Sequence, residues 1–312
     1  MIDGQTPETL PRQQAWEEWD ARAWGAFTNR PDRALLTALE VLRAESAPAA
    51  RARQFRRIRG VRHLDFVQQT HAERTTVRAW FSRDGRTTYS RDLGAITAED
   101  FVLGHPTRDY SRRKTQQHKP VAIWTHTTQG HVHCESRLER EFVLLADFDP
   151  RVMHISAQPF TALWPNGSPL KKHTPDFAVL SPGLPPIAVD VKTPAAAAKP
   201  ANVARHKHIR DTFAAAGILH IIWTGLPDAA AKNLSNFSKA RPDPDIAMSY
   251  GFELLRHWRP SITANELVNT TGRFRAVDRA LALQVIRHLL WTGALCTDLN
   301  RPYTSASVLE IS

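Results

Sequence analysis

Apolar residues in the N-terminal part of the chain follow first helical and then strand spacing. They recur every three or four positions at Trp16, Trp19, Ala23 and Phe27, and after Pro31-Asp32 at Leu35, Leu39 and Leu42. This spacing predicts short amphipathic helices. Residues 77–81 and 87–89 read as strands on either side of the turn-forming segment 83–86. We expect a β-hairpin there.

The central region alternates between helical and extended patterns. A helix is predicted from Glu135, with apolar positions at Leu138, Phe142, Leu145 and Ala146, and Asp149-Pro150 ends it. Extended segments follow at residues 152–156, 160–164, 177–180 and 187–191, and a helix over 203–216 leads into an apolar strand at 218–223. This order predicts an α/β fold with a short mixed sheet flanked by helices.

The pattern becomes helical in the C-terminal region. Residues 225–250 are rich in Ala, Asn, Pro and Asp, and we expect a domain boundary there. Thr263 and Glu266 form a capping-box pair, and a helix carrying Val277, Leu281, Val285 and Leu289 is expected to stop at Gly293. Residues 295–299 and 308–311 predict a hairpin. Helices followed by a hairpin are typical of a winged-helix domain.

Composition adds a strong positive charge to this picture. The 312 residues include 41 Lys and Arg against 31 Asp and Glu, a net charge of +10, and this favours a polyanionic partner. Basic clusters lie at Arg51–Arg62, at Arg112, Arg113, Lys114 and Lys119, and at Arg205 and Lys207. Each cluster is either a DNA-backbone contact or an ordinary solvated face, and residues 104–120 are either a linker or a DNA-facing loop.

Other features exclude some classes of protein. No apolar stretch is long enough to cross a membrane and residues 1–25 lack a secretory pattern, so we expect a cytoplasmic protein. Cys134 and Cys296 are the only cysteines, too few for a disulfide scaffold. His131-x-His133-Cys134 lacks a fourth ligand at a recognised spacing, so we interpret these residues as strand or loop.

The candidate chemistry lies in Thr174-Pro175-Asp176 and in the strand that ends with Asp190-Val191-Lys192. Alternate side chains of a strand share a face, so Asp190 and Lys192 are expected to project together. If Asp176 ends the neighbouring strand, two carboxylates and an ammonium converge, as in PD-(D/E)xK nucleases. The carboxylates suit Mg²⁺, or Mn²⁺ in its place, and Lys192 would orient or deprotonate water and stabilise developing charge.

A further carboxylate is expected from the helix that begins near Glu135. Glu135, Glu139 and Glu141 are all available, and their spacing does not choose among them. A chance D-x13-D-x-K pattern on a surface strand is the alternative to a nuclease site. The Thr-Pro-Asp segment, the carboxylate within an apolar strand and the basic chain favour the nuclease.

The motifs together resemble TnsA, the endonuclease subunit of heteromeric transposases. The similar segments are residues 130–139, Phe148-Asp149-Pro150, Gln158-Pro159, Thr174-Pro175-Asp176-Phe177 and Val189-Asp190-Val191-Lys192. The resemblance runs from about Lys114 to Trp223 and includes the winged-helix outline. It implies a PD-(D/E)xK endonuclease domain at 113–228 and a winged-helix-like domain at 229–312. Residues 1–112 lie outside the resemblance, and from the length of the chain we expect them to form an N-terminal α+β extension.

The resemblance also implies roles for individual residues. Glu139 would be the helix carboxylate, with Glu135 as a substitute, and Asp176 the central metal ligand. Lys192 would be the catalytic lysine. Asp190 stands where some members carry Gln or Glu, so it would add a metal ligand, and Gln158 would give structural support.

The partners implied are transposon-end DNA, a DDE-type transposase subunit resembling TnsB and an AAA+ ATPase resembling TnsC. In that family the nuclease cuts the 5′ ends of the mobile element. Two alternatives stay open. One is another nuclease of the same fold, acting in restriction or repair, and the other is a DNA-binding relative without catalysis.

Overall fold

The computed structural model describes residues 33–44, 75–85, 87–107, 121–274 and 278–311. The chain divides into two compact units, the first made of residues 1–147 with 151–225 and the second of 148–150 with 226–312. The predicted helix at 16–27 and the basic segments at 51–62 and 112–119 lie outside the described residues. Within the described part of the chain, no helix is both long and apolar enough to cross a membrane.

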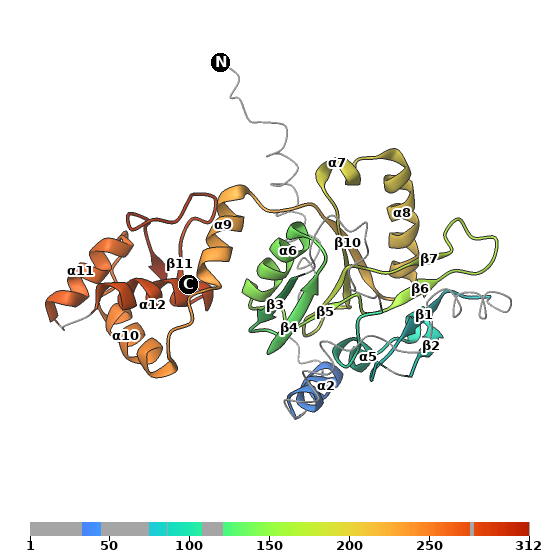
Figure 1. Ribbon diagram of the computed structural model, residues 1–312, viewed down its shortest axis with the longest axis horizontal. Helices are drawn as coiled ribbons and strands as arrows, with labels where there is room; N and C mark the ends of the chain where they lie inside the picture. Colours follow the sequence, from blue (N-terminus) through green and yellow to red (C-terminus); the bar gives the residue numbers. More distant parts are fainter. Residues whose placement is uncertain (1–32, 45–74, 86, 108–120, 275–277, 312) are drawn as a thin grey trace, which may run out of the picture. The chain divides into compact units, whose positions relative to one another are not determined.

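A four-stranded mixed sheet forms the centre of the first unit (Figure 1). Its strands are β5 (His154–Ala157), β8 (Phe177–Leu180), β9 (Ile187–Val191) and β10 (Leu219–Trp223), in the order β10-β9-β8-β5. β9 and β10 are parallel and the other neighbours antiparallel. The parallel pair needs a crossover, which α8 (Pro200–Ala215) supplies. The α/β prediction is confirmed, and β8 and β9 have the predicted bounds.

Each face of this sheet is covered by one helix, as Figure 1 shows for α6 (Arg137–Phe148) and α8. On the α6 side, the ring of Phe142 lies 5.3 Å from that of Phe177. On the α8 side, Phe213 belongs to a buried apolar cluster that includes Ala188. Successive side chains of β9 therefore point alternately toward the two helices. Ala188 and Asp190 share the α8 face.

A second sheet of four antiparallel strands adjoins this core. It contains β2 (Tyr89–Asp92), β1 (Arg78–Phe81), β6 (Thr161–Leu163) and β7 (Lys172–His173), in that order. The β1–β2 hairpin confirms the prediction. β6 was expected in the same sheet as β5, but Gln158, with φ of 46°, and Pro159 redirect the chain before it. Because β1 pairs with β6, the boundary predicted near residue 112 does not separate two independent sheets.

Within the described residues this unit also contains the 3-10 helix η3 (Leu93–Ala95), α5 (Ala98–Val102) and α7 (Pro194–Ala197), besides a helix and a hairpin that bear on the predictions. The helix α2 (Arg33–Arg43) confirms the leucine spacing, with Leu35 and Leu39 buried. The hairpin of β3 (Val121–Thr125) and β4 (Gly130–Cys134) was not predicted as such, although β4 agrees with the strand-or-loop interpretation of its histidines. The turn between these strands places Gln129 at φ 50°.

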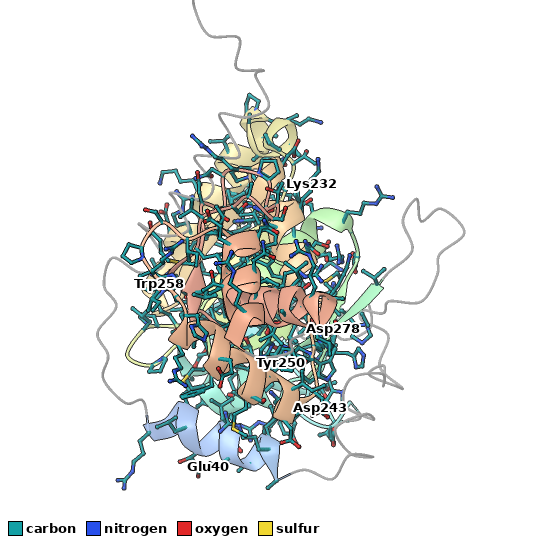
Figure 2. The ribbon with its side chains drawn as sticks, turned by 90° about the vertical axis from the view of Figure 1, so that its left-hand side faces the viewer. Glu40, Lys232, Asp243, Tyr250, Trp258 and Asp278 are labelled. Carbon is teal, nitrogen blue, oxygen red and sulfur yellow. The ribbon has the colours of Figure 1, made fainter. Side chains whose placement is uncertain are left out.

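The second unit is mainly helical. Its elements are α9 (Asp228–Phe237), α10 (Pro244–Arg256), α11 (Ala264–Phe274), α12 (Arg279–Trp291), β11 (Leu295–Cys296) and β12 (Glu310–Ile311). The chain divides between Gly225 and Leu226, at the start of the segment 225–250 in which a boundary was expected. Most of that segment is helical, because alanines favour α9 and Asp243 caps α10, accepting from Asp245 N at 2.9 Å. Asp278 caps α12 in the same way, and both caps are labelled in Figure 2.

Local signals in this unit were predicted correctly. Glu266 Oε2 accepts from Thr263 N at 2.9 Å and Thr263 Oγ1 accepts from Glu266 N at 3.2 Å, so the capping box is formed. Gly293 directly follows the C-cap of α12 and has a φ of 75°, a left-handed conformation that favours glycine. β11 and β12 pair antiparallel, Leu295 opposite Ile311, as a short hairpin. A winged helix remains a prediction.

Candidate active site

Asp176 is held where β8 begins, beside the end of β9. Its Oδ2 accepts hydrogen bonds from Val191 N at 2.8 Å and from Lys192 Nζ at 3.1 Å. We had expected Asp176 at an open sheet edge, but the residue is only 9% exposed. Burial, and then the negative charge of Asp190, raise the pKa of the Asp176 carboxyl, while Lys192 opposes the rise. Asp176 is therefore a buried carboxylate whose charge is only partly compensated.

Lys192 follows β9 directly and continues its pairing with β10, since its N–H donates to Trp223 O at 3.0 Å. Its ammonium also donates to Val191 O at 3.1 Å. Burial acts to lower the pKa of Lys192, but the charges of Asp176, Asp190 and Glu139 outweigh burial and raise it. Lys192 is consequently a positive donor at neutral pH and not a general base.

Glu139 lies in the first turn of α6, and the helix start fixes its side chain. Its Oε2 accepts from Glu135 N at 2.7 Å, its Oε1 accepts from Ser136 Oγ at 3.1 Å, and its own N–H donates to Ser136 Oγ at 3.1 Å. These bonds form a capping arrangement. Burial, together with the charges of Asp176 and Glu135, raises the pKa of Glu139 to about 7. The negative charge of Asp176 acts on Glu139 in addition to burial, so the two carboxylates belong to one electrostatic group.

Gln158 supports this arrangement from the opposite side of β8. Its N–H donates to Asp176 O at 2.9 Å, and its Nε2 donates to Glu135 Oε1 at 2.9 Å. The residue is 2% exposed, and among the described residues its Oε1 has no hydrogen-bond partner. Gln158 thus links the start of β8 to the start of α6, consistent with a supporting role.

The side chains of Glu139 and Asp176 fit a hard divalent cation. Both offer carboxylate oxygens, the ligands that Mg²⁺ prefers. Each oxygen of Glu139 accepts one of the hydrogen bonds given above and retains a second lone pair, whereas Oδ2 of Asp176 already accepts two. Burial is the main cause of both raised pKa values, and the charge of Asp176 adds to it at Glu139 and that of Asp190 at Asp176. A bound cation would favour the charged form of both carboxylates.

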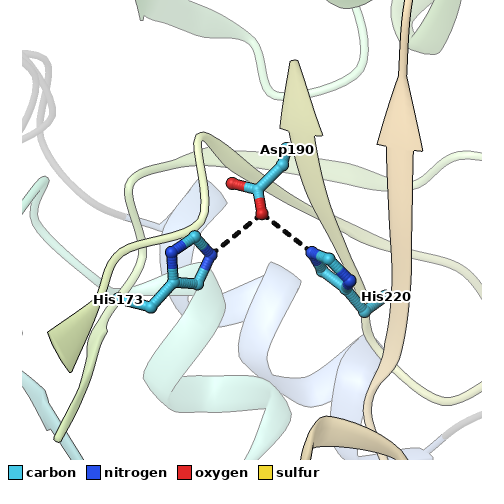
Figure 3. Close-up of side chains that lie close together, drawn as sticks. All are labelled: His173, Asp190 and His220. Atoms are coloured by element: carbon cyan, nitrogen blue, oxygen red, sulfur yellow. Dashed lines mark hydrogen bonds and ion pairs between the residues drawn. The ribbon is translucent and has the colours of Figure 1, made fainter. Parts of the chain in front are cut away.

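Asp190, the third carboxylate expected at the metal, has a different environment (Figure 3). It is 1% exposed and faces α8, and its Oδ2 lies 2.8 Å from His220 Nε2, 2.9 Å from His173 Nε2 and 3.4 Å from His206 Nδ1. Burial would raise the pKa of Asp190, but the charge of His173 and the close ring nitrogens of His173, His206 and His220 hold it well below its usual range. We therefore do not assign Asp190 to the Mg²⁺ ligands.

Sequence reasoning missed the three histidines as a group. His173, His206 and His220 come from β7, α8 and β10, and we had interpreted His206 only as part of a basic helix face. One signal was present in the sequence. His220 interrupts an apolar strand next to the strand that Asp190 interrupts, and two polar residues in adjacent buried strands require partners.

The predicted DNA contacts on α8 differ in their surroundings. Arg205 is half-buried, with Nη2 at 3.4 Å from Lys172 O and from His173 Nδ1. Lys207 is exposed and pairs with Asp211 at 2.7 Å, with 74% of its side chain accessible. A surface pair of this kind contributes little to stability, so Lys207 can exchange its partner for a phosphate. The guanidinium of Arg205 instead contacts other residues of the protein.

Comparison with known proteins adds no family assignment: no protein-family model matches this chain, and no curated protein matches it.

Proposed function

We propose that this chain is a metal-dependent DNA endonuclease of the PD-(D/E)xK type, and that it acts as a TnsA-like subunit of a heteromeric transposase. The observation that carries the proposal is the group formed by Glu139, Asp176 and Lys192. Burial, with neighbouring negative charge, raises the pKa values of both carboxylates, and an ammonium donates a hydrogen bond to one of them. Strongly perturbed pKa values of this kind concentrate at functional sites.

The chemistry follows from the position of each group. Glu139 and Asp176 would hold Mg²⁺, which when bound supplies Lewis-acid stabilisation of the charge that develops on a phosphate. Val191 N–H and Lys192 Nζ fix the orientation of Asp176 through its Oδ2. Lys192, being protonated, would stabilise negative charge on the phosphate and orient water, and would not abstract a proton.

The fold and the charge of the chain support the same proposal. A mixed sheet with one helix on each face is what the TnsA resemblance implies for residues 113–228. Four helices and a terminal hairpin in the second unit are compatible with a winged-helix-like module at 229–312. The net charge of +10 suits transposon-end DNA as the substrate. Partners resembling TnsB and TnsC are part of the proposal.

A reconstituted cleavage assay tests the proposed function. The purified chain is combined with a DDE-type transposase resembling TnsB and an AAA+ ATPase resembling TnsC, on a plasmid carrying the ends of a candidate element. We expect 5′-strand cuts at those ends with Mg²⁺ or Mn²⁺ and none with EDTA. Sequence-specific cutting by the chain alone would instead indicate a restriction-type nuclease. Mg²⁺-independent cutting, or none in any mixture, would contradict the proposal.

DNA affinity should depend steeply on salt and little on sequence. Replacing Arg112, Arg113 and Lys114 by Ala should weaken binding to all duplexes alike, because the basic segment offers phosphate contacts and no base-reading motif. In a titration by fluorescence anisotropy, the slope of log affinity against log salt should flatten by up to about one per lost contact. An unchanged slope would make the segment an ordinary linker. We expect the partner transposase to select the DNA sequence, and discrimination between unrelated duplexes by this chain alone would contradict that expectation.

A further inference from the structure

The second polar cluster of the first unit lies on the α8 face of the central sheet and is independent of the proposed nuclease chemistry. Its members are Asp190, His173, His206 and His220, all at most 8% exposed. One ligand atom each from His173, Asp190 and His220 lie within 4.8 Å of one another. Figure 3 shows the two imidazoles on either side of the Asp190 carboxylate, with a ring nitrogen of each directed toward the same oxygen.

Hydrogen bonding alone does not account for these nitrogens. Asp190 Oδ2 forms a well-directed hydrogen bond with His220 Nε2 at 2.8 Å. His173 Nε2 is almost as close, at 2.9 Å, yet neither it nor His206 Nδ1 has a properly directed hydrogen bond to any described residue. Buried polar atoms without partners are rare, because leaving them unsatisfied costs about 1–3 kcal/mol each. Two such nitrogens beside one carboxylate oxygen indicate a missing central partner.

A metal ion has the size and chemistry that this space requires. Tetrahedral coordination with bonds of about 2.0–2.2 Å separates ligand atoms by roughly 3.3 Å. The Oδ2–nitrogen separations of 2.8, 2.9 and 3.4 Å are close to that value. Three imidazoles and one carboxylate suit Zn²⁺ or another late first-row divalent cation, whereas Mg²⁺ prefers an all-oxygen set.

Ligation through Nε2 of His173 requires the ring proton on Nδ1, which lies 3.4 Å from Arg205 Nη2. A proton there would face a guanidinium donor, so metal binding requires Arg205 Nη2 to donate to its other acceptor, Lys172 O, which is equally close. His206 and His220 stack, with ring centroids 5.8 Å apart, and this fixes the orientation of both rings.

We infer that His173, Asp190 and His220, with His206 as fourth ligand, form a Zn²⁺ site that holds β7, β9, β10 and α8 together. Four protein ligands leave no open position, so the ion is structural and does no hydrolysis. Binding of the ion would also fix the side chain of Asp190, which lies two residues before Lys192 in the chain. Zn²⁺ would thereby position the end of β9 at the proposed active site.

Metal analysis of the intact chain tests this inference. We expect about one equivalent of Zn²⁺ per chain after purification. Removal of the ion by a chelator should lower the Tm by roughly several degrees, and adding Zn²⁺ back should restore it. Co²⁺ added to the metal-free chain should give the intense visible absorption of a four-coordinate ion. Weak absorption typical of six-coordinate Co²⁺ would overturn the inference, as would less than roughly a tenth of an equivalent of bound Zn²⁺ at saturation.

Variants separate this site from the proposed nuclease site. His173→Ala and His206→Ala should each weaken Zn²⁺ binding by at least roughly tenfold and alter the Co²⁺ spectrum. His208→Gln is the matched control, because His208 lies on the same helix but stacks near Trp164, with centroids 5.9 Å apart. Asp176→Asn should leave the Zn²⁺ content unchanged even though cleavage is lost. Equal Zn²⁺ affinity in His173→Ala, His206→Ala and the wild type would overturn the assignment of ligands.

Discussion

Asp176→Asn and Lys192→Ala are each expected to reduce Mg²⁺-dependent cleavage by at least about 10³-fold in the reconstituted assay. Asn preserves the shape of Asp176 and can still accept from Val191 N–H, so the main change is the loss of the negative charge that would bind the metal. Lys192→Ala removes an ammonium that donates to Asp176 Oδ2, and with it the positive charge that would lie beside the phosphate. The measurement is the initial rate of strand cleavage on transposon-end DNA.

Asp211→Asn serves as the matched control for the loss of a carboxylate, because Asp211 lies on the surface of α8 with 60% of its side chain exposed. It should cut at the wild-type rate. All variants should keep the wild-type circular dichroism spectrum and a cooperative unfolding transition. Cleavage near the wild-type rate by Asp176→Asn or Lys192→Ala would remove the proposed active site, whatever the metal content of the Zn²⁺ site.

The two strands that carry the candidate residues were the most predictable part of the fold. Phe177–Leu180 and Ile187–Val191 are short apolar runs between proline- and glycine-rich turns, and the turns fix where each strand begins and ends. The capping boxes were predictable for the same reason, since their bonds join residues three positions apart. Local chemistry therefore located Asp176, Lys192 and Glu139 on the correct elements.

Features that depend on contacts distant in sequence were not predictable. His173, His206 and His220 meet only because β7, α8 and β10 pack around β9, and no sequence spacing encodes that meeting. The partition of β5 and β6 into different sheets also depends on tertiary pairing, since β6 pairs with β1 more than 70 residues earlier in the chain. An alternating strand pattern shows which residues share a face, but not what that face meets.

The direction of Asp190 illustrates the distinction. Strand alternation predicts that Asp190 lies on the same face of the sheet as Lys192. In the structure the face that carries Ala188 and Asp190 is the one covered by α8. The short side chain of Asp190 is captured within that face by imidazoles, whereas the longer Lys192 reaches Asp176 at the end of the sheet. Side-chain length and local partners, rather than strand periodicity, thus divide one predicted cluster into two sites.

Glu139→Gln is expected to have opposite effects on catalysis and on stability. Cleavage should fall by at least about 10²-fold, because a neutral amide is a poor Mg²⁺ ligand, whereas Glu135→Gln and Glu141→Gln should have much smaller effects. Only Glu139 combines a first-turn position with a pKa raised by burial and by the charge of Asp176. If Glu135→Gln were the most damaging change, the metal ligand would be the substitute carboxylate, and the assignment of Glu139 would be wrong.

The stability effect follows from the sign of the same pKa shift. The pKa of Glu139 is about 7 in the folded chain against 4.5 as its ordinary value, so the folded state favours the protonated form. Its stabilising contribution is complete below pH 4.5 and is lost as the pH rises through about 7, at a cost of up to about 3 kcal/mol. Glu139→Gln removes this loss and can keep the capping bond to Glu135 N. In urea unfolding without added Mg²⁺, the variant should therefore be more stable than the wild type at pH 8 but not at pH 4.5. Equal dependence of stability on pH in the two proteins would show that the pKa of Glu139 is not raised by burial beside Asp176.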